Sequence, residues 1–72
     1  MEFDFSKLLG RIVEKFGTRS AFAAELGLAD SVLSCRLSNK VYFNAEEIHR
    51  SCEILDIDPQ DIPVYFFAVK VR

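Results

Sequence analysis

The feature that most constrains the fold is a helical pattern on each side of Gly27. Thr18 is suited to cap a helix over residues 19–26, and a second helix is expected from about Asp30 to about Ser38. Glycine readily adopts the left-handed backbone conformation that ends a helix, so Gly27 fits a tight turn. Two helices joined in this way cross at an angle that projects the second helix outward. The residues expected to hold the pair together are Phe22, Ala23, Leu26, Leu28 and Leu33.

Two further helical patterns flank this pair. Residues 6–16 carry apolar side chains at helical spacing, with Ser6 as the expected cap and Gly17 as the end. Asn44 and Glu47 form the start of a capping box for another helix, which is expected to end near Asp56. The expected core consists of Leu8, Ile12, Val13, Phe16, Phe22, Ala23, Leu26, Leu33, Leu37, Ile48, Cys52 and Leu55.

The two ends of the chain alternate instead. Phe3 and Phe5 alternate with acidic residues, and residues 64–72 predict an edge strand, paired with the N-terminal segment or with a second copy. Before this tail, Pro59 is expected to begin a single turn that Pro63 ends. The sequence therefore predicts one helix-turn-helix domain over residues 1–72, an all-α, compact four- to five-helix bundle with a short extended C-terminal tail.

Charge and length limit the function. A chain of 72 residues allows one domain with a marginal core, and its formal net charge is −2. A free-standing DNA binder is usually basic, because phosphate neutralisation supplies most of its affinity. Residues 1–43 hold six Lys or Arg against five Asp or Glu, and residues 44–72 hold three against six. Only the first part of the chain therefore suits a polyanion. Since 50% of the residues are hydrophobic, part of the apolar surface is expected to meet a second protein.

Other functions have no support in the sequence. Cys35 and Cys52 form no CxxC pair, and His49 makes no metal-ligand spacing with them. No nucleophile is paired with a base, so neither an enzyme nor a cofactor is expected. No apolar run reaches transmembrane length, and the first residues include Glu2 and Asp4 rather than a basic segment. We expect a cytoplasmic protein without a membrane partner.

Several basic residues need a separate interpretation. Lys7, Arg11 and Lys15 share one helix face, which favours a solvated stripe over a phosphate contact. Arg36 stands where many helix-turn-helix units bury a branched apolar residue. Its stem is expected to pack while its head reaches solvent.

The chain also resembles a known family. The segments FSKLLGRIVEKFGTRSAFAAELGL, LSCRLSNK and IPVYFF are similar to small Cro-like proteins from phages of Gram-positive bacteria. The similarity covers nearly the whole chain. In its short length and its acidity, the chain also resembles the modulator-of-repression proteins of lactococcal temperate phages. This resemblance implies that the first helix packs on the helix-turn-helix unit. It also implies that the outer helix carries the binding face, which in Cro-like proteins enters the major groove.

The outer helix nevertheless suits DNA poorly. Base edges are best read by Arg, Lys, Asn or Gln, and the leading face of this helix has none of them. Asp30 would repel a phosphate, whereas Val32 offers apolar contact to a protein. Two functions stay open: a regulator that binds the DNA-binding domain of a phage repressor and modulates its operator binding, or a Cro-like repressor that binds operator DNA itself. The candidate face consists of Arg19, Asp30, Ser31, Val32, Ser34, Cys35, Ser38 and Lys40.

Overall fold

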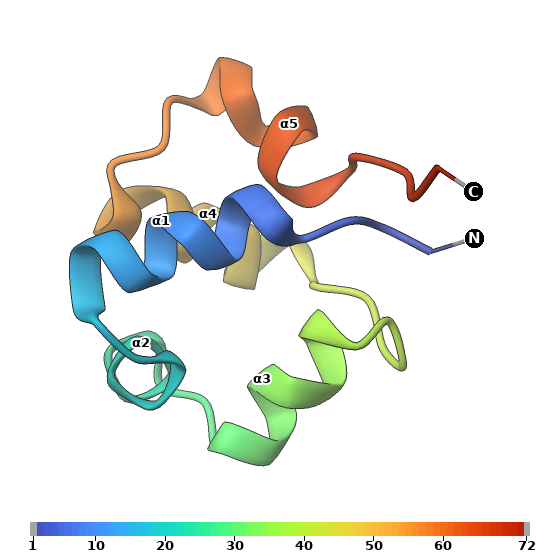
Figure 1. Cartoon of the computed structure of the whole chain (residues 1–72). Helices are drawn as coiled ribbons and strands as arrows, with labels where there is room; N and C mark the ends of the chain where they lie inside the picture. Colours follow the sequence, from blue (N-terminus) through green and yellow to red (C-terminus); the bar gives the residue numbers. More distant parts are fainter. Residues whose placement is uncertain (1, 72) are drawn as a thin grey trace.

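Helices follow one another along the computed structural model, which describes residues 2–71 (Figure 1). Their bounds are α1 (Ser6–Phe16), α2 (Arg19–Leu26), α3 (Asp30–Leu37), α4 (Ala45–Leu55), the 3-10 turn η1 (Pro59–Asp61) and α5 (Ile62–Phe66). The predicted all-α class is confirmed. The expected positions of the first four helices agree closely with the structure.

Most of the helix ends follow the expected capping chemistry. The Thr18 side chain accepts a hydrogen bond from the Ala21 N–H, and Gly27 ends α2 with a φ of 82°. Asn44 and Glu47 form a complete capping box at the start of α4. The expected cap at Ser6 is wrong, because Ser6 is the first residue of α1. Its N–H and hydroxyl instead donate to the Asp4 carboxylate, and these bonds hold the pKa of Asp4 below its ordinary value.

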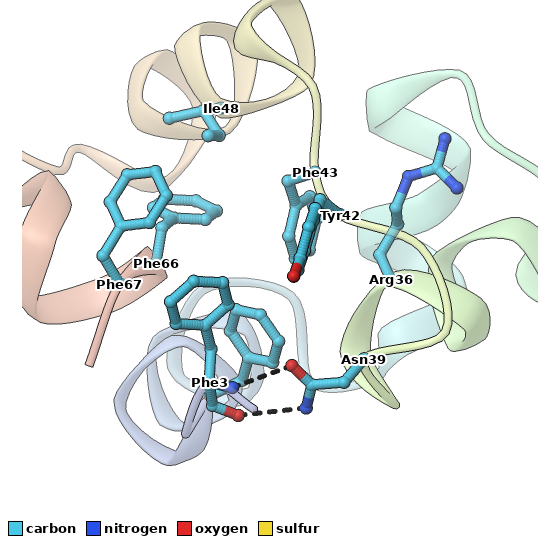
Figure 2. Close-up of a pocket in the computed structure, with 9 residues that line it drawn as sticks. Phe3, Arg36, Asn39, Tyr42, Phe43, Ile48, Phe66 and Phe67 are labelled. Atoms are coloured by element: carbon cyan, nitrogen blue, oxygen red, sulfur yellow. Dashed lines mark hydrogen bonds between the residues drawn. The ribbon is translucent and has the colours of Figure 1, made fainter. Parts of the chain in front are cut away.

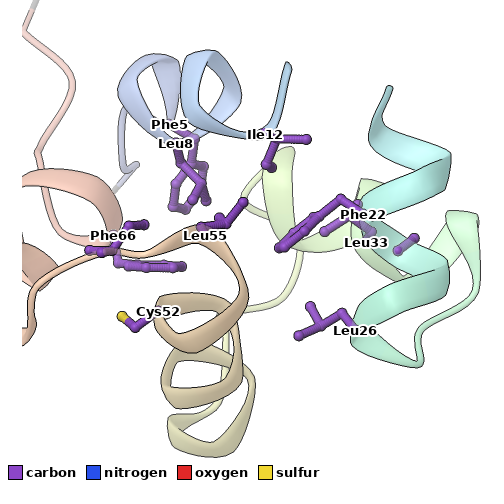
Figure 3. Packing of buried hydrophobic residues seen from close by; sticks show 11 residues of the cluster. Phe5, Leu8, Ile12, Phe22, Leu26, Leu33, Cys52, Leu55 and Phe66 are labelled. Carbon is purple, nitrogen blue, oxygen red and sulfur yellow. The ribbon is translucent and has the colours of Figure 1, made fainter. Parts of the chain in front are cut away.

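The core lies between α1, α2, α4 and α5 (Figure 3). Its buried residues are Phe5, Leu8, Ile12, Phe22, Ala23, Leu26, Leu33, Cys52, Leu55, Ile57 and Phe66. The placement of Val13 in the core is wrong: its side chain is 57% exposed, because the covered face of α1 runs through Leu8 and Ile12. Phe16, Leu37 and Ile48 pack against the core but stay half-buried. Phe5, Ile57 and Phe66 were not expected there.

The C-terminal segment differs from its predicted strand. Pro63 lies in the first turn of α5 instead of ending the preceding turn, because proline needs no N–H partner at that position. The predicted strand is therefore wrong: residues 64–66 are helical, Val69 is the only bridge residue of 67–71, and Arg72 lies outside the described residues. Beyond α5, Phe3 and Val69 form an antiparallel bridge, so the expected pairing of the tail with the N-terminal segment is confirmed. The two ends of the chain lie side by side (Figure 1).

Two of the three basic residues of this α1 face make contacts within the protein. Arg11 donates to the main-chain oxygens of Leu55 and Asp56, each at 2.9 Å, and so satisfies the free carbonyls at the end of α4. Lys15 pairs with the Asp56 carboxylate at 2.6 Å, which lowers the pKa of Asp56. The interpretation of this face as a merely solvated stripe is therefore wrong for Arg11 and Lys15.

Candidate functional site

The outer helix α3 lies at the edge of the molecule, away from α1 (Figure 1). Leu33 is the only buried one of its eight residues, and Asp30, Ser31 and Ser34 form its exposed side. The exposed candidates are Arg19, Asp30, Ser31, Ser34, Ser38 and Lys40, and the half-buried ones are Val32 and Cys35. The structure thus leaves the whole candidate face accessible along α3 and its two flanks.

At the start of α3, the candidate residues gather around one shallow depression. Arg19 and Ser20 from α2 and Asp30 and Ser34 from α3 line this depression, which has a volume of about 200 Å³, with Leu33 at its base. The Ser20 hydroxyl donates to one Asp30 carboxylate oxygen at 2.9 Å. Asp30 is therefore engaged with α2 through that oxygen, and its negative charge stays at the exposed tip of the helix.

At the other end of α3, the chain folds back over Cys35. The main-chain N–H groups of Lys40 and Val41 donate to the Cys35 carbonyl oxygen at 3.0 and 3.3 Å, and the Ser38 hydroxyl donates to it at 3.3 Å. This turn groups Cys35, Ser38 and Lys40.

Arg36 differs from its prediction. Its guanidinium is not free in solvent but donates two hydrogen bonds to the Glu47 carboxylate, at 3.0 and 3.1 Å. The two side chains are only 17% and 11% exposed. A carboxylate partner accounts for the half-buried position of this arginine. In the sequence, however, Glu47 was recognisable only as part of a helix cap.

The Arg36–Glu47 pair has a defined electrostatic state. Burial raises the pKa of Glu47, but hydrogen bonds from Arg36 and from the Asn44 N–H outweigh burial and leave that pKa below its ordinary value of 4.5. Its hydrogen bonds to Glu47 raise the pKa of Arg36. Both groups are therefore charged at neutral pH, and the only guanidinium of α3 is committed to a partner within the protein.

The described residues offer no other chemistry at this face. Over residues 2–71, no three His, Cys, Asp or Glu side chains come together closely enough to hold a metal ion. The helices in this part of the chain are all too short or too polar to cross a membrane. Of the two thiols, Cys35 is half-buried and Cys52 is buried in α4, as the sequence predicted. What the face presents is a small surface of hydroxyls, one valine and a few charges.

Known proteins resemble this chain over its full length. The solution structure of the modulator of repression (MOR) of the temperate bacteriophage TP901-1 from Lactococcus lactis is similar, with 44% sequence identity and a TM-score of 0.84. The similarity covers 100% of this chain and 97% of that one. No curated protein matches the chain. The model of a family described as a protein of unknown function, DUF739, matches residues 1–69, and the chain therefore belongs to this family.

Proposed function

We propose that this protein is a phage transcriptional regulator that binds the cognate phage repressor through the outer face of α3 and thereby modulates the repressor's binding to operator DNA. The similar protein of phage TP901-1 is a modulator of repression, which supports this role. The resemblance to Cro-like helix-turn-helix proteins stays a prediction.

The observation that carries the proposal is the lack of a base-reading side chain on α3. Arg36 is the only Arg, Lys, Asn or Gln in this helix, and its guanidinium is already paired with the Glu47 carboxylate. Bidentate contacts from such side chains are the main source of base discrimination in the major groove. The formal net charge of −2 also disfavours the phosphate contacts on which operator affinity depends.

The same face suits the DNA-binding surface of a repressor. Such a surface is basic because it neutralises phosphates, so Asp30 at the tip of α3 is complementary to it. Ser31 and Ser34 offer hydroxyls for hydrogen bonds, and Val32 and Cys35 offer apolar contact. A protein bound there would compete directly with operator DNA.

The substitution Val32→Arg tests the proposal. At a protein contact, it places an unpaired charge in a desolvated interface, which should cost several kcal/mol and abolish a micromolar complex. Binding to the purified repressor is measured by isothermal titration calorimetry. The matched control is Val13→Arg, because Val13 is an exposed valine on α1, away from α3, and should bind as the wild type does.

Operator binding by the same variants separates the two functions. If α3 entered the major groove, Val32→Arg would add a favourable charge, and affinity for operator DNA would hold or rise. Unchanged repressor binding together with gained operator affinity would refute the proposal. It would assign the protein to the operator-binding repressors instead.

A further inference from the structure

The outer helix α3 is attached to the rest of the protein with little apolar burial. Leu33 is its one buried residue, Leu37 packs against the core but stays half-buried, and Ala29 provides no side-chain cap at the start of the helix. Burial of apolar surface is the main source of packing energy in proteins, so α3 receives only a small share of it. The contacts that compensate are polar, and those of Arg36 and Asn39 lie at or just beyond the C-terminal end of the helix.

Asn39 joins the end of α3 to both ends of the chain. It adopts a left-handed conformation with a φ of 67°, and its side-chain amide faces the main chain of Phe3 (Figure 2). The Phe3 N–H donates to Asn39 Oδ1 at 2.8 Å, and Asn39 Nδ2 donates to the Phe3 carbonyl at 3.1 Å. Phe3 is bridged in turn to Val69. The Asn39 side-chain amide therefore makes with the main chain of Phe3 the two hydrogen bonds that a neighbouring strand would otherwise make.

Arg36 joins α3 to the start of α4. Its guanidinium is directed away from the aromatic side chains around Phe3 (Figure 2) and contacts the Glu47 carboxylate. The Glu47 oxygen that accepts from Arg36 Nε also accepts the Asn44 N–H at 3.1 Å, as part of the capping box. Because α4 is anchored in the core through Cys52 and Leu55, Arg36 connects the outer helix to a well-packed element.

We propose that Arg36 and Asn39 are positioning residues for partner binding: they hold α3 in the orientation that the repressor recognises, without being part of the contact. This inference rests on the proposed function. The neighbouring residues Cys35, Ser38 and Lys40 belong to the candidate face, so a shift of this end of α3 moves the face with it. When only a fraction of molecules has the competent orientation, the apparent affinity falls by that fraction.

Two substitutions remove these contacts, and Arg36→Met also leaves the Glu47 carboxylate without its partner. Arg36→Met keeps an unbranched stem without the guanidinium, and Asn39→Gly tolerates the positive φ without the amide. Each should weaken repressor binding by about tenfold, as expected if about a tenth of the molecules stays competent. Arg36→Lys retains the charge and a single donor to Glu47, and should recover part of the affinity.

A control variant separates positioning from general stability. Cys52→Ala removes a buried core contact on α4, far from the face, and should lower stability without weakening the repressor complex. Affinity is measured for all variants under conditions in which circular dichroism shows them folded. An equal loss of affinity in Cys52→Ala and Arg36→Met would overturn the positioning role.

Amide hydrogen exchange of the free protein provides a readout that does not need the repressor. Arg36→Met and Asn39→Gly should speed exchange in α3 while the amides of α4 stay as slow as in the wild type. If both variants bind normally and Val32→Arg still abolishes binding, the positioning role is refuted and the proposed function stands. If the wild type does not bind the repressor, the proposed function and the positioning role in repressor binding both fail, and faster exchange confined to α3 would show only that Arg36 and Asn39 hold this helix in place.

Discussion

The two cysteine-bearing helices, α3 and α4, are built in opposite ways. The helix α4 has a complete capping box and buries Glu47, Ser51, Cys52 and Leu55. The helix α3 has no side-chain cap and buries Leu33 alone. A capped helix with a wide buried face is part of the core, whereas a helix held by Leu33, the half-buried Leu37 and polar contacts leaves its outer surface free for a partner. The difference separates the part of this protein that provides stability from the part that is available for binding.

The largest expected effect tests where the stability lies. Leu55→Ala, in the fully buried face of α4, should lower the free energy of unfolding by about 2–5 kcal/mol. Val32→Ala, on α3, should lower it by less than about 1 kcal/mol, because its side chain is already partly exposed. Urea denaturation followed by circular dichroism measures both values. Similar losses in the two variants would contradict the division between α3 and α4.

The next effect concerns the polar contact between the two helices. Glu47→Gln keeps an oxygen for the capping box but removes the charge opposite Arg36, and should cost about 1.5–3 kcal/mol at neutral pH. The folded-state pKa of Glu47 lies below its ordinary value of 4.5, so this stabilisation is fully present above that value. It is lost as pH falls through the lowered pKa, where wild type and variant should converge in unfolding experiments. A difference that stays constant down to that range would exclude the ion pair as its source.

A smaller effect compares the two thiols. Cys35 on α3 is half-buried, while Cys52 on α4 is buried and burial raises the pKa of its thiol. A smaller thiolate fraction and lower accessibility to the reagent both slow the alkylation of Cys52. Labelling of the folded protein, followed by mass spectrometry, should modify Cys35 at least about tenfold faster, a difference of about 1.4 kcal/mol. The single-cysteine variants Cys35→Ser and Cys52→Ala serve as controls, and equal rates would show that α4 opens as readily as α3.

The smallest effect is a gain in stability within α4. The Ser51 hydroxyl is fully buried and has no hydrogen-bond partner among residues 2–71. Burying a hydroxyl without a hydrogen-bond partner costs free energy, and replacing the hydroxyl with hydrogen removes that cost. Ser51→Ala should therefore raise the free energy of unfolding by about 1 kcal/mol. Ser34→Ala, at an exposed position on α3, should change it by less than about 0.5 kcal/mol. A loss of stability in Ser51→Ala would mean that the hydroxyl makes a hydrogen bond.

Local patterns were sufficient where the interactions are close in sequence. The caps at Thr18 and Asn44, the turn at Gly27 and most of the apolar face of α4 involve residues within one or two helical turns of each other. Helical periodicity and capping chemistry therefore predicted the positions of the first four helices. The outward position of most candidate residues on α3 followed as well, because Leu33 and Leu37, one turn apart, mark the side of this helix that packs inward.

The tertiary structure decided what depends on residues far apart in the chain. Phe5 and Phe66 lie in segments with an alternating pattern, yet each packs against Phe43 and joins the core. Val13 fits the helical pattern but meets no covering element.

The orientation of α3 also depends on residues that are far apart in the chain. Asn39 pairs with Phe3 across 36 positions, and Arg36 pairs with Glu47 across 11. The first four helices and the face that α3 presents, but not α5, could be predicted from the sequence alone, because periodicity and capping act between near neighbours. Only the tertiary structure determined how that face is held, because hydrogen bonds between distant residues leave no periodic trace in the sequence.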